Sequence, residues 1–153
     1  MLASPFIFFN FERRKLKMRK QTITNPDYNG NERTEDFYFN LSKQEVYEME
    51  MTTNGGLVEM VQQIVKAKNV PAIADIFKSF ILKAYGEKSP DGKYFNKIDE
   101  KTGRPLSERF AQTEAFSILY MSLAQDDKKA ADFFNDVIPK PDKQAPAPHP
   151  ATN

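Results

Sequence analysis

The chain has 153 residues, 40% of them hydrophobic and 28% charged, a composition typical of a soluble globular protein with one domain. It contains no Cys and only one His, His149 in a Pro-rich tail, which excludes disulfides, thiolate metal sites, Cys nucleophiles and a His base in the folded body. The net charge of +1 combines +3 on residues 1–17 with −2 on the rest, and a body with this balance does not favour nucleic acid as a partner.

The first seventeen residues, MLASPFIFFNFERRKLK, place an apolar segment before basic residues, the reverse of the order in a secretory signal. The codons of Glu12-Arg13-Arg14 can read GAA-AGG-AGG, which contains a bacterial ribosome-binding sequence at a workable distance from the Met18 codon. We therefore expect residues 1–17 to be a misassigned upstream start or a flexible leader. No apolar run approaches the ~20 residues needed to cross a bilayer, so no membrane partner is expected.

Two segments of strand character, residues 20–24 and 33–41, flank Asn29-Gly30, a strong hairpin signal because both residues tolerate positive φ. The overlapping stretch NPDYNGNERTED also approaches the calcium-loop pattern D-x-[DN]-x-[DN]-G-x5-E. A calcium loop lies between helices and ends in a bidentate Glu, whereas these flanks are strand-like and the twelfth residue is Asp36. We expect a turn and no metal site.

Helical periodicity dominates after the hairpin. Ser42 and Glu45 form a capping box at the start of the first helix. Asn69 is expected to end the second helix, Pro71 to begin the third, and Gly86 to end the third. The expected inward positions of the second and third helices are Leu57, Met60, Val61, Ile64, Val65, Ile73, Ile76, Phe77, Phe80, Ile81 and Ala84.

Residues 86–108 carry two turn signals and are expected to form a surface excursion, in which KYFNKI is either a short strand or an extended loop. Neither Gly-rich phosphate-loop pattern occurs in the chain. Pro105 and Ser107 favour the start of a short helix. Thr113 is expected to cap a longer helix that continues to about Ala124.

The helix after Thr113 is apolar all round, which indicates that it is central in a core or buried against a partner. Asp126 is expected to cap a last helix that ends before Pro139, and residues 140–153 to form a disordered Pro/Ala-rich tail. Met and aromatic stripes are more often core filler than binding surface, but adaptable partner grooves also use Met. We predict that part of the set formed by Phe116, Tyr120, Met121, Phe133 and Phe134 binds a partner.

The carboxylates of the chain suggest structural roles. Glu45 with Glu48, and Asp126 with Asp127, lie at predicted helix starts, where negative charge complements the helix dipole. Nothing in the sequence brings a nucleophile, a base and an oxyanion donor together. We predict no catalytic, cofactor or metal site, and hence a protein that is not an enzyme.

The predicted fold is mainly α, within the α+β class. Residues 18–139 are expected to form a single domain, an N-terminal β-hairpin followed by a compact bundle of about five to six short helices. Three stretches of this body, in order, resemble the tail assembly chaperones of long-tailed phages and prophages of Gram-positive bacteria. They are NGNERTEDFYFNLSKQEVYEMEM, GGLVEMVQQIVKAKNVPAIADIFKSFILKAYGEKSPDGKYF and FAQTEAFSILYMSLAQDDKKAADFFNDVIP.

The resemblance implies a non-enzymatic assembly factor in the cytoplasm of the bacterial host cell that is absent from the mature virion. It implies the tape measure protein as partner, with the tail tube protein as a further candidate, and either a homo-oligomer or pairing with a longer form made by frameshifting. A tape measure helix exposes apolar stripes that must be masked reversibly, a task that helical grooves with Met and Phe suit. The alternative is a small structural tail or head–tail protein of the particle.

Overall fold

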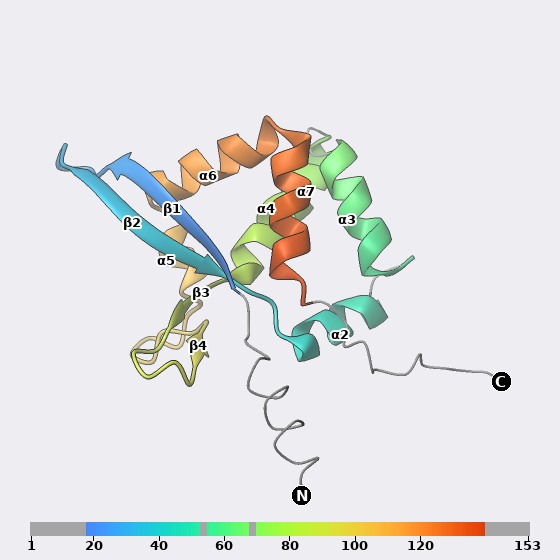
Figure 1. Cartoon of the computed structure of the whole chain (residues 1–153), viewed down its shortest axis with the longest axis horizontal. Helices are drawn as coiled ribbons and strands as arrows, with labels where there is room; N and C mark the ends of the chain where they lie inside the picture. The colour runs from blue at the N-terminus through green and yellow to red at the C-terminus, as the bar shows by residue number, and fades with distance from the viewer. Residues whose placement is uncertain (1–17, 53–54, 68–69, 140–153) are drawn as a thin grey trace, which may run out of the picture.

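The computed structural model describes residues 18–52, 55–67 and 70–139, in which an antiparallel four-stranded sheet of order β1-β2-β3-β4 packs with six helices (Figure 1). The fold is mainly α with a leading hairpin, as the sequence predicted. The predictions for Asn69, the first seventeen residues and the tail after residue 139 lie outside the described residues. The elements are β1 (Arg19–Pro26), β2 (Glu32–Phe39), α2 (Lys43–Thr52), α3 (Gly56–Ala67), α4 (Pro71–Ala84), β3 (Tyr85–Lys88), β4 (Phe95–Asn96), α5 (Ser107–Phe110), α6 (Glu114–Ala124) and α7 (Asp127–Val137).

The hairpin predicted around Asn29-Gly30 is confirmed, and its loop is organised by Asp27. The backbone N–H of Asp27 donates to the Asn31 carbonyl (2.8 Å), and its Oδ1 accepts from the N–H groups of Asn29 and Asn31 (both 2.9 Å). Gly30 has a φ of 86°, whereas no non-glycine residue in the described part of the chain has a positive φ. Only one residue of the Asn-Gly pair therefore uses the left-handed conformation, as in a three-residue hairpin loop with Gly at its last position.

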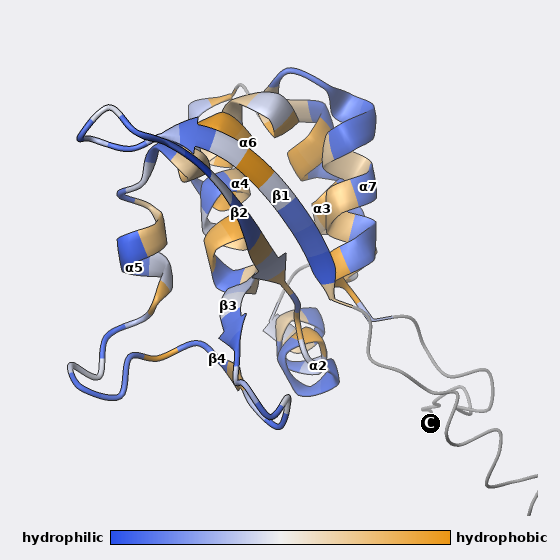
Figure 2. Cartoon of the chain, turned by 60° about the vertical axis from the view of Figure 1, so that its left-hand side comes forward, coloured by the Kyte–Doolittle hydropathy of each residue, from blue (hydrophilic) through white to orange (hydrophobic). Residues whose placement is uncertain are grey.

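The two faces of the hairpin differ in polarity because side chains alternate along a strand. Ile23 on β1 is buried on the inner face, where α6 and α7 pack against the strand. On the outer face the Thr22 hydroxyl donates to Asp36 Oδ1 (2.6 Å) and the hydroxyl groups of Thr24 and Thr34 are 2.8 Å apart. In Figure 2 most of β1 and β2 is coloured hydrophilic, and the helices lie behind the hairpin. The apolar contacts of the hairpin are thus directed to the helices.

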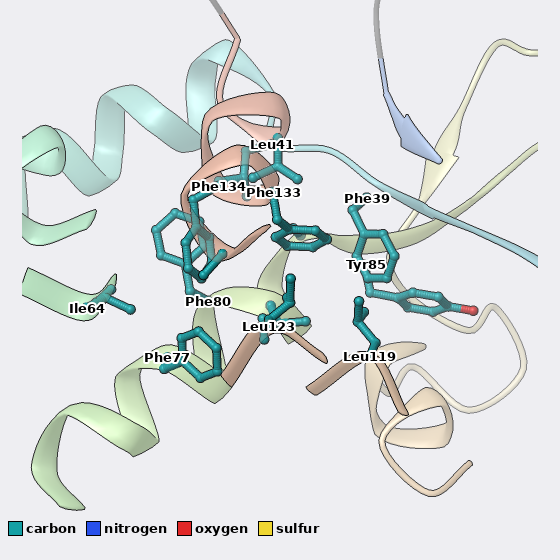
Figure 3. Packing of buried hydrophobic residues seen from close by; sticks show 14 of the residues in the cluster. Phe39, Leu41, Ile64, Phe77, Phe80, Tyr85, Leu119, Leu123, Phe133 and Phe134 are labelled. Carbon is teal, nitrogen blue, oxygen red and sulfur yellow. The ribbon is translucent and has the colours of Figure 1, made fainter. Parts of the chain in front are cut away.

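Aromatic side chains form the centre of the core and join the sheet to the helices (Figure 3). The Phe39 ring on β2 lies 5.1 Å from the ring of Phe133 on α7, and Phe134 lies 4.8 Å from Phe80 on α4, both as edge contacts. Such pairs contribute about 0.5–1.5 kcal/mol each beyond the burial of their area. Sheet, α4 and α7 therefore share one continuous core.

The helix starts that the sequence predicted are confirmed. The Glu45 N–H donates to the Ser42 hydroxyl (3.1 Å), while Glu45 Oε1 accepts from the Ser42 N–H (2.8 Å), which completes the capping box. Thr113 caps α6 by accepting from the Phe116 N–H, and Asp126 caps α7. Pro71 opens α4. These caps satisfy backbone donors that have no partner within the helix.

The prediction that Gly86 ends the third helix is wrong. α4 ends at Ala84, and the next residues enter β3 directly, where Gly86 pairs with Tyr38 of β2. A Cβ atom on Gly86 would lie 2.5 Å from the Phe95 ring and 2.9 Å from the Asn96 carbonyl. Glycine is required here by the close approach of β4 and not by a left-handed backbone, since the φ of Gly86 is not positive.

Candidate partner-binding surfaces

The predicted partner-binding set divides between the core and the surface. Phe133 and Phe134 have no exposed area and Phe116 is 6% exposed, so all three belong to the core of the single chain. Tyr120 is half-buried, with its ring 5.3 Å from that of Phe77. A partner could reach Phe133 or Phe134 only if the core opened. Their position agrees with the core role that the sequence left open as the alternative.

Met121 lies on the outer face of α6 and is 49% exposed. Ile118, one turn earlier on the same face, is 37% exposed. A shallow surface groove is lined by both residues and by polar neighbours from α6 and the start of α7, including Ser122 and Lys129. Ile118 was not in the predicted set, although its position three residues before Met121 places the two on one helix face. α6 is thus apolar towards the core and also, in part, towards solvent.

A second group of exposed apolar residues lies on α2 and α3. Tyr47 and Met51 are one turn apart on α2 and are 66% and 68% exposed, and Val58 on α3 is 72% exposed. No residue of α2 is buried. The helix is tied to α3 by Glu50, whose Oε1 accepts from the Leu57 N–H (2.9 Å). The Glu50 carboxylate therefore caps α3.

A cleft of about 510 Å³ opens between the hairpin and the segment from α5 to the start of α6. The turn half of the hairpin forms one wall, and Arg109 and Gln112 belong to the other. Tyr85 from β3 lies in the floor, where its ring stacks on Phe110 with centroids 4.3 Å apart and planes 3° apart. The sequence did not predict this cleft, because its walls are more than seventy residues apart along the chain.

An ion pair between Glu45 and Lys97 connects the long excursion to the rest of the molecule. Lys97 Nζ lies 3.2 Å from Glu45 Oε2 and donates to the carbonyls of Asn40 (2.9 Å) and Lys83 (2.7 Å). Burial would raise the pKa of Glu45, but the Ser42 N–H and Lys97 outweigh it and hold the pKa below its usual value. Burial lowers the pKa of Lys97 more than Glu45 raises it. The interaction is structural: it holds β4 against α2 and α4.

The residues of the calcium-like pattern are used by the hairpin. Asp27 Oδ1 accepts from the backbone N–H groups of Asn29 and Asn31. The hydrogen bond from Asn31 is the largest cause of the lowered pKa of Asp27. Asp36 accepts from Thr22 across the sheet. Within residues 18–52, 55–67 and 70–139, no group of three or more His, Cys, Asp or Glu is placed to hold a metal ion.

The described helices are all too short or too polar to cross a membrane.

A family model described as "Phage tail assembly chaperone" matches residues 18–146, most of the chain. Neither the curated proteins nor the solved structures contain a match.

Proposed function

Because the chain belongs to the phage tail assembly chaperone family, we propose that it is a non-enzymatic assembly factor that binds the tape measure protein. In this role it keeps the tape measure protein soluble in the cytoplasm of the bacterial host cell while the tail assembles, and it leaves before the virion is complete. The proposed source is a long-tailed phage or prophage of Gram-positive bacteria.

We place the client contact on the outer face of α6. The observation that carries this assignment is that Ile118 and Met121 are exposed side by side on a helix whose opposite face is core. An apolar helical stripe of a client can lie along such a face, and the unbranched Met side chain adapts to different partners. Within the predicted set, Met121 and the edge of Tyr120 would touch the client, whereas Phe116, Phe133 and Phe134 would support α6 from beneath.

We further propose that Tyr47 and Met51 on α2 serve contacts between copies of the chain or with a longer frameshifted form. Their large exposed fractions support this assignment. Exposed apolar residues grouped on one helix face are typical of protein interfaces. The tail tube protein is a second candidate partner for the same surface.

Co-expression with the tape measure protein of the same phage or prophage tests the client surface. Met121→Asp and Ile118→Asp should keep the helical circular-dichroism spectrum, because both side chains are partly exposed, and should lower the soluble fraction of the tape measure protein severalfold. Ser79→Asp adds the same charge at an exposed position of α4 and should leave solubility unchanged. Tape measure protein that stays fully soluble with both α6 variants would remove this face from the client contact.

Phe134→Asp separates a core role from a direct contact. A carboxylate buried without a partner costs several kcal/mol, and Phe134 has no exposed area, so the variant should unfold at room temperature. A Phe134→Asp chain that stays folded and fails only to hold the tape measure protein soluble would instead place Phe134 in the contact.

A further inference from the structure

The cleft between the hairpin and α5–α6 contains a buried donor without an acceptor. Asn25 on β1 lines this cleft and is only 5% exposed. Its side-chain Nδ2 is buried and has no hydrogen-bond partner among the described residues. Buried polar groups are nearly always paired, because an unpaired one destabilises the fold, while an apolar side chain of similar shape would not. The position of Asn25 therefore suggests an acceptor that a bound molecule supplies.

The charges of the cleft favour a cationic occupant. Glu35 and Glu87 line it, and neither has an ion pair within the described residues. The Tyr85 hydroxyl donates to Glu87 Oε2 (3.0 Å), and burial together with the charges of Glu87 and Glu35 raises the pKa of this hydroxyl. The charged side chains that line the cleft are four carboxylates and two guanidinium groups, with a formal sum of −2: Asp27, Glu35, Glu87, Glu114, Arg33 and Arg109.

The floor of the cleft is aromatic. Phe110 stacks on Tyr85, and the half-buried Phe37 ring lies 5.2 Å from Phe110. An apolar side chain of an occupant can rest on this floor, while its charged and polar groups meet the walls. A volume of about 510 Å³ accommodates a few residues of a peptide.

We propose that this cleft binds a short segment of a protein partner in which an apolar residue is flanked by Lys or Arg. The apolar side chain lies on the aromatic floor, the cation pairs with Glu35 and Glu87, and a backbone carbonyl of the segment accepts from Asn25 Nδ2. Rotation of the terminal amide of Asn25 presents its N–H groups to the cleft, because torsions of this type are broad. The inference rests on the proposed function only in taking the partner to be a protein, and it assigns a site separate from the outer face of α6.

Three capped peptides test the proposal with the full chain, observed by the side-chain amide signals of Asn25 in a nitrogen–proton correlation spectrum. Ser-Lys-Phe-Leu-Lys-Ser should shift these signals saturably with a Kd below about 1 mM at low salt. Ser-Glu-Phe-Leu-Glu-Ser should bind at least about tenfold more weakly, because its charges meet the cleft carboxylates. Ser-Lys-Ser-Ser-Lys-Ser should not saturate. Equal binding of the acidic and basic peptides, or no shift with any of them, overturns the proposal.

Two variants test the named groups. Asn25→Val removes the unpaired donor, so it should raise the melting temperature while it weakens binding of the basic peptide at least about tenfold. Thr24→Val, on the outer face of the same strand, should leave affinity unchanged. Glu35→Gln should also weaken binding, and it keeps the test decisive if Asn25→Val fails to fold. Affinity that both Asn25→Val and Glu35→Gln leave intact overturns the proposal.

The peptide-binding tests of the cleft can be told apart from the solubility test of the proposed function. Failure of the peptides to bind, while the tape measure protein still depends on Met121 for solubility, would reject only the cleft. Peptide binding that depends on Asn25, in a chain that does not keep the tape measure protein soluble, would reject only the client assignment.

Discussion

The carboxylate of Glu45 has two structural tasks. One oxygen accepts from the Ser42 N–H at the start of α2. The carboxylate also pairs with Lys97, which lies in the long excursion of residues 86–108. The first task is local and could be predicted from the S-x-x-E spacing. The second joins residues fifty-two positions apart. The lowered pKa of Glu45 reflects both, against the opposing effect of its burial.

Glu45→Gln should make the stability of the protein less dependent on acidic pH. The folded-state pKa of Glu45 lies below its ordinary value of 4.5, so its contribution to stability is present above that pH and is lost as the pH falls through the folded-state pKa. Gln can still accept from Ser42 but cannot pair with Lys97. We expect a melting temperature a few degrees lower than that of the unchanged chain at pH 7, and a smaller difference near about pH 3.

Glu48→Gln on the exposed side of α2 is the matched control. It should leave the melting temperature nearly unchanged at both neutral and acidic pH. Thermal melts by circular dichroism across the pH range measure both variants. A deficit of Glu45→Gln that is the same at neutral and acidic pH would show that the charge of Glu45 does not stabilise the fold.

At the scale of elements, the connection from α4 to β3 is the tightest in the fold. α4 passes into the strand without a loop, and β3 then joins β2 on one side and β4 on the other. The Asn40 N–H also donates to the Ala84 carbonyl (2.8 Å), so the end of β2 covers the end of α4. Because β4 lies so close to Gly86, the third strand tolerates no side chain at that position.

Gly86→Ala should destabilise the protein by about 1–3 kcal/mol, the usual cost of an added methyl group in a packed site. The new Cβ would collide with the Phe95 ring and the Asn96 carbonyl. In a Phe95→Ala background Gly86→Ala should destabilise the protein less, because the Phe95 ring is absent. Some destabilisation should remain, because the Asn96 carbonyl is still there. Urea unfolding of the four chains measures this coupling, and strictly additive effects would place the strain elsewhere.

At the scale of the whole molecule, the hairpin and the helices form one body. β1 contacts α6 and α7, and the Leu41 N–H donates to the Val137 carbonyl (3.0 Å), so the first and last described elements are held together. Figure 1 shows the turn of the hairpin projecting beyond the helices, beside α6. We propose that residues 18–139 are the complete folding unit.

A chain shortened to residues 18–139 should melt within a few degrees of the full chain. About 1 kcal/mol shifts the melting temperature of a domain of this size by roughly 2–8 °C, so scanning calorimetry can detect even one weak contact from either end. A chain of residues 18–146, the extent of the family match, is the useful comparison. A midpoint that falls markedly at 139 and recovers at 146 would assign the missing contacts to residues 140–146.

Local sequence determined the elements of this protein. The capping box of Ser42, the caps at Thr113 and Asp126, and the Asn-Gly turn each depend on residues within a few positions of one another, so spacing alone predicts them. Helical periodicity likewise identified most inward positions of α3 and α4. The exception is Ile76, which is 41% exposed.

Tertiary structure alone decided which apolar residues are core and which are surface. Helical periodicity gives Phe134 and Met121 equal claims to the core. In the structure, however, Phe77 and Phe80 of α4 cover the Phe134 ring, whereas no described element covers the face of α6 that carries Met121. The pairing of β3 with β2, the contact of Lys97 with Glu45, and the cleft around Asn25 arise in the same way. Each depends on where distant segments meet, and that is set by the packing of the entire core and not by any one stretch of sequence.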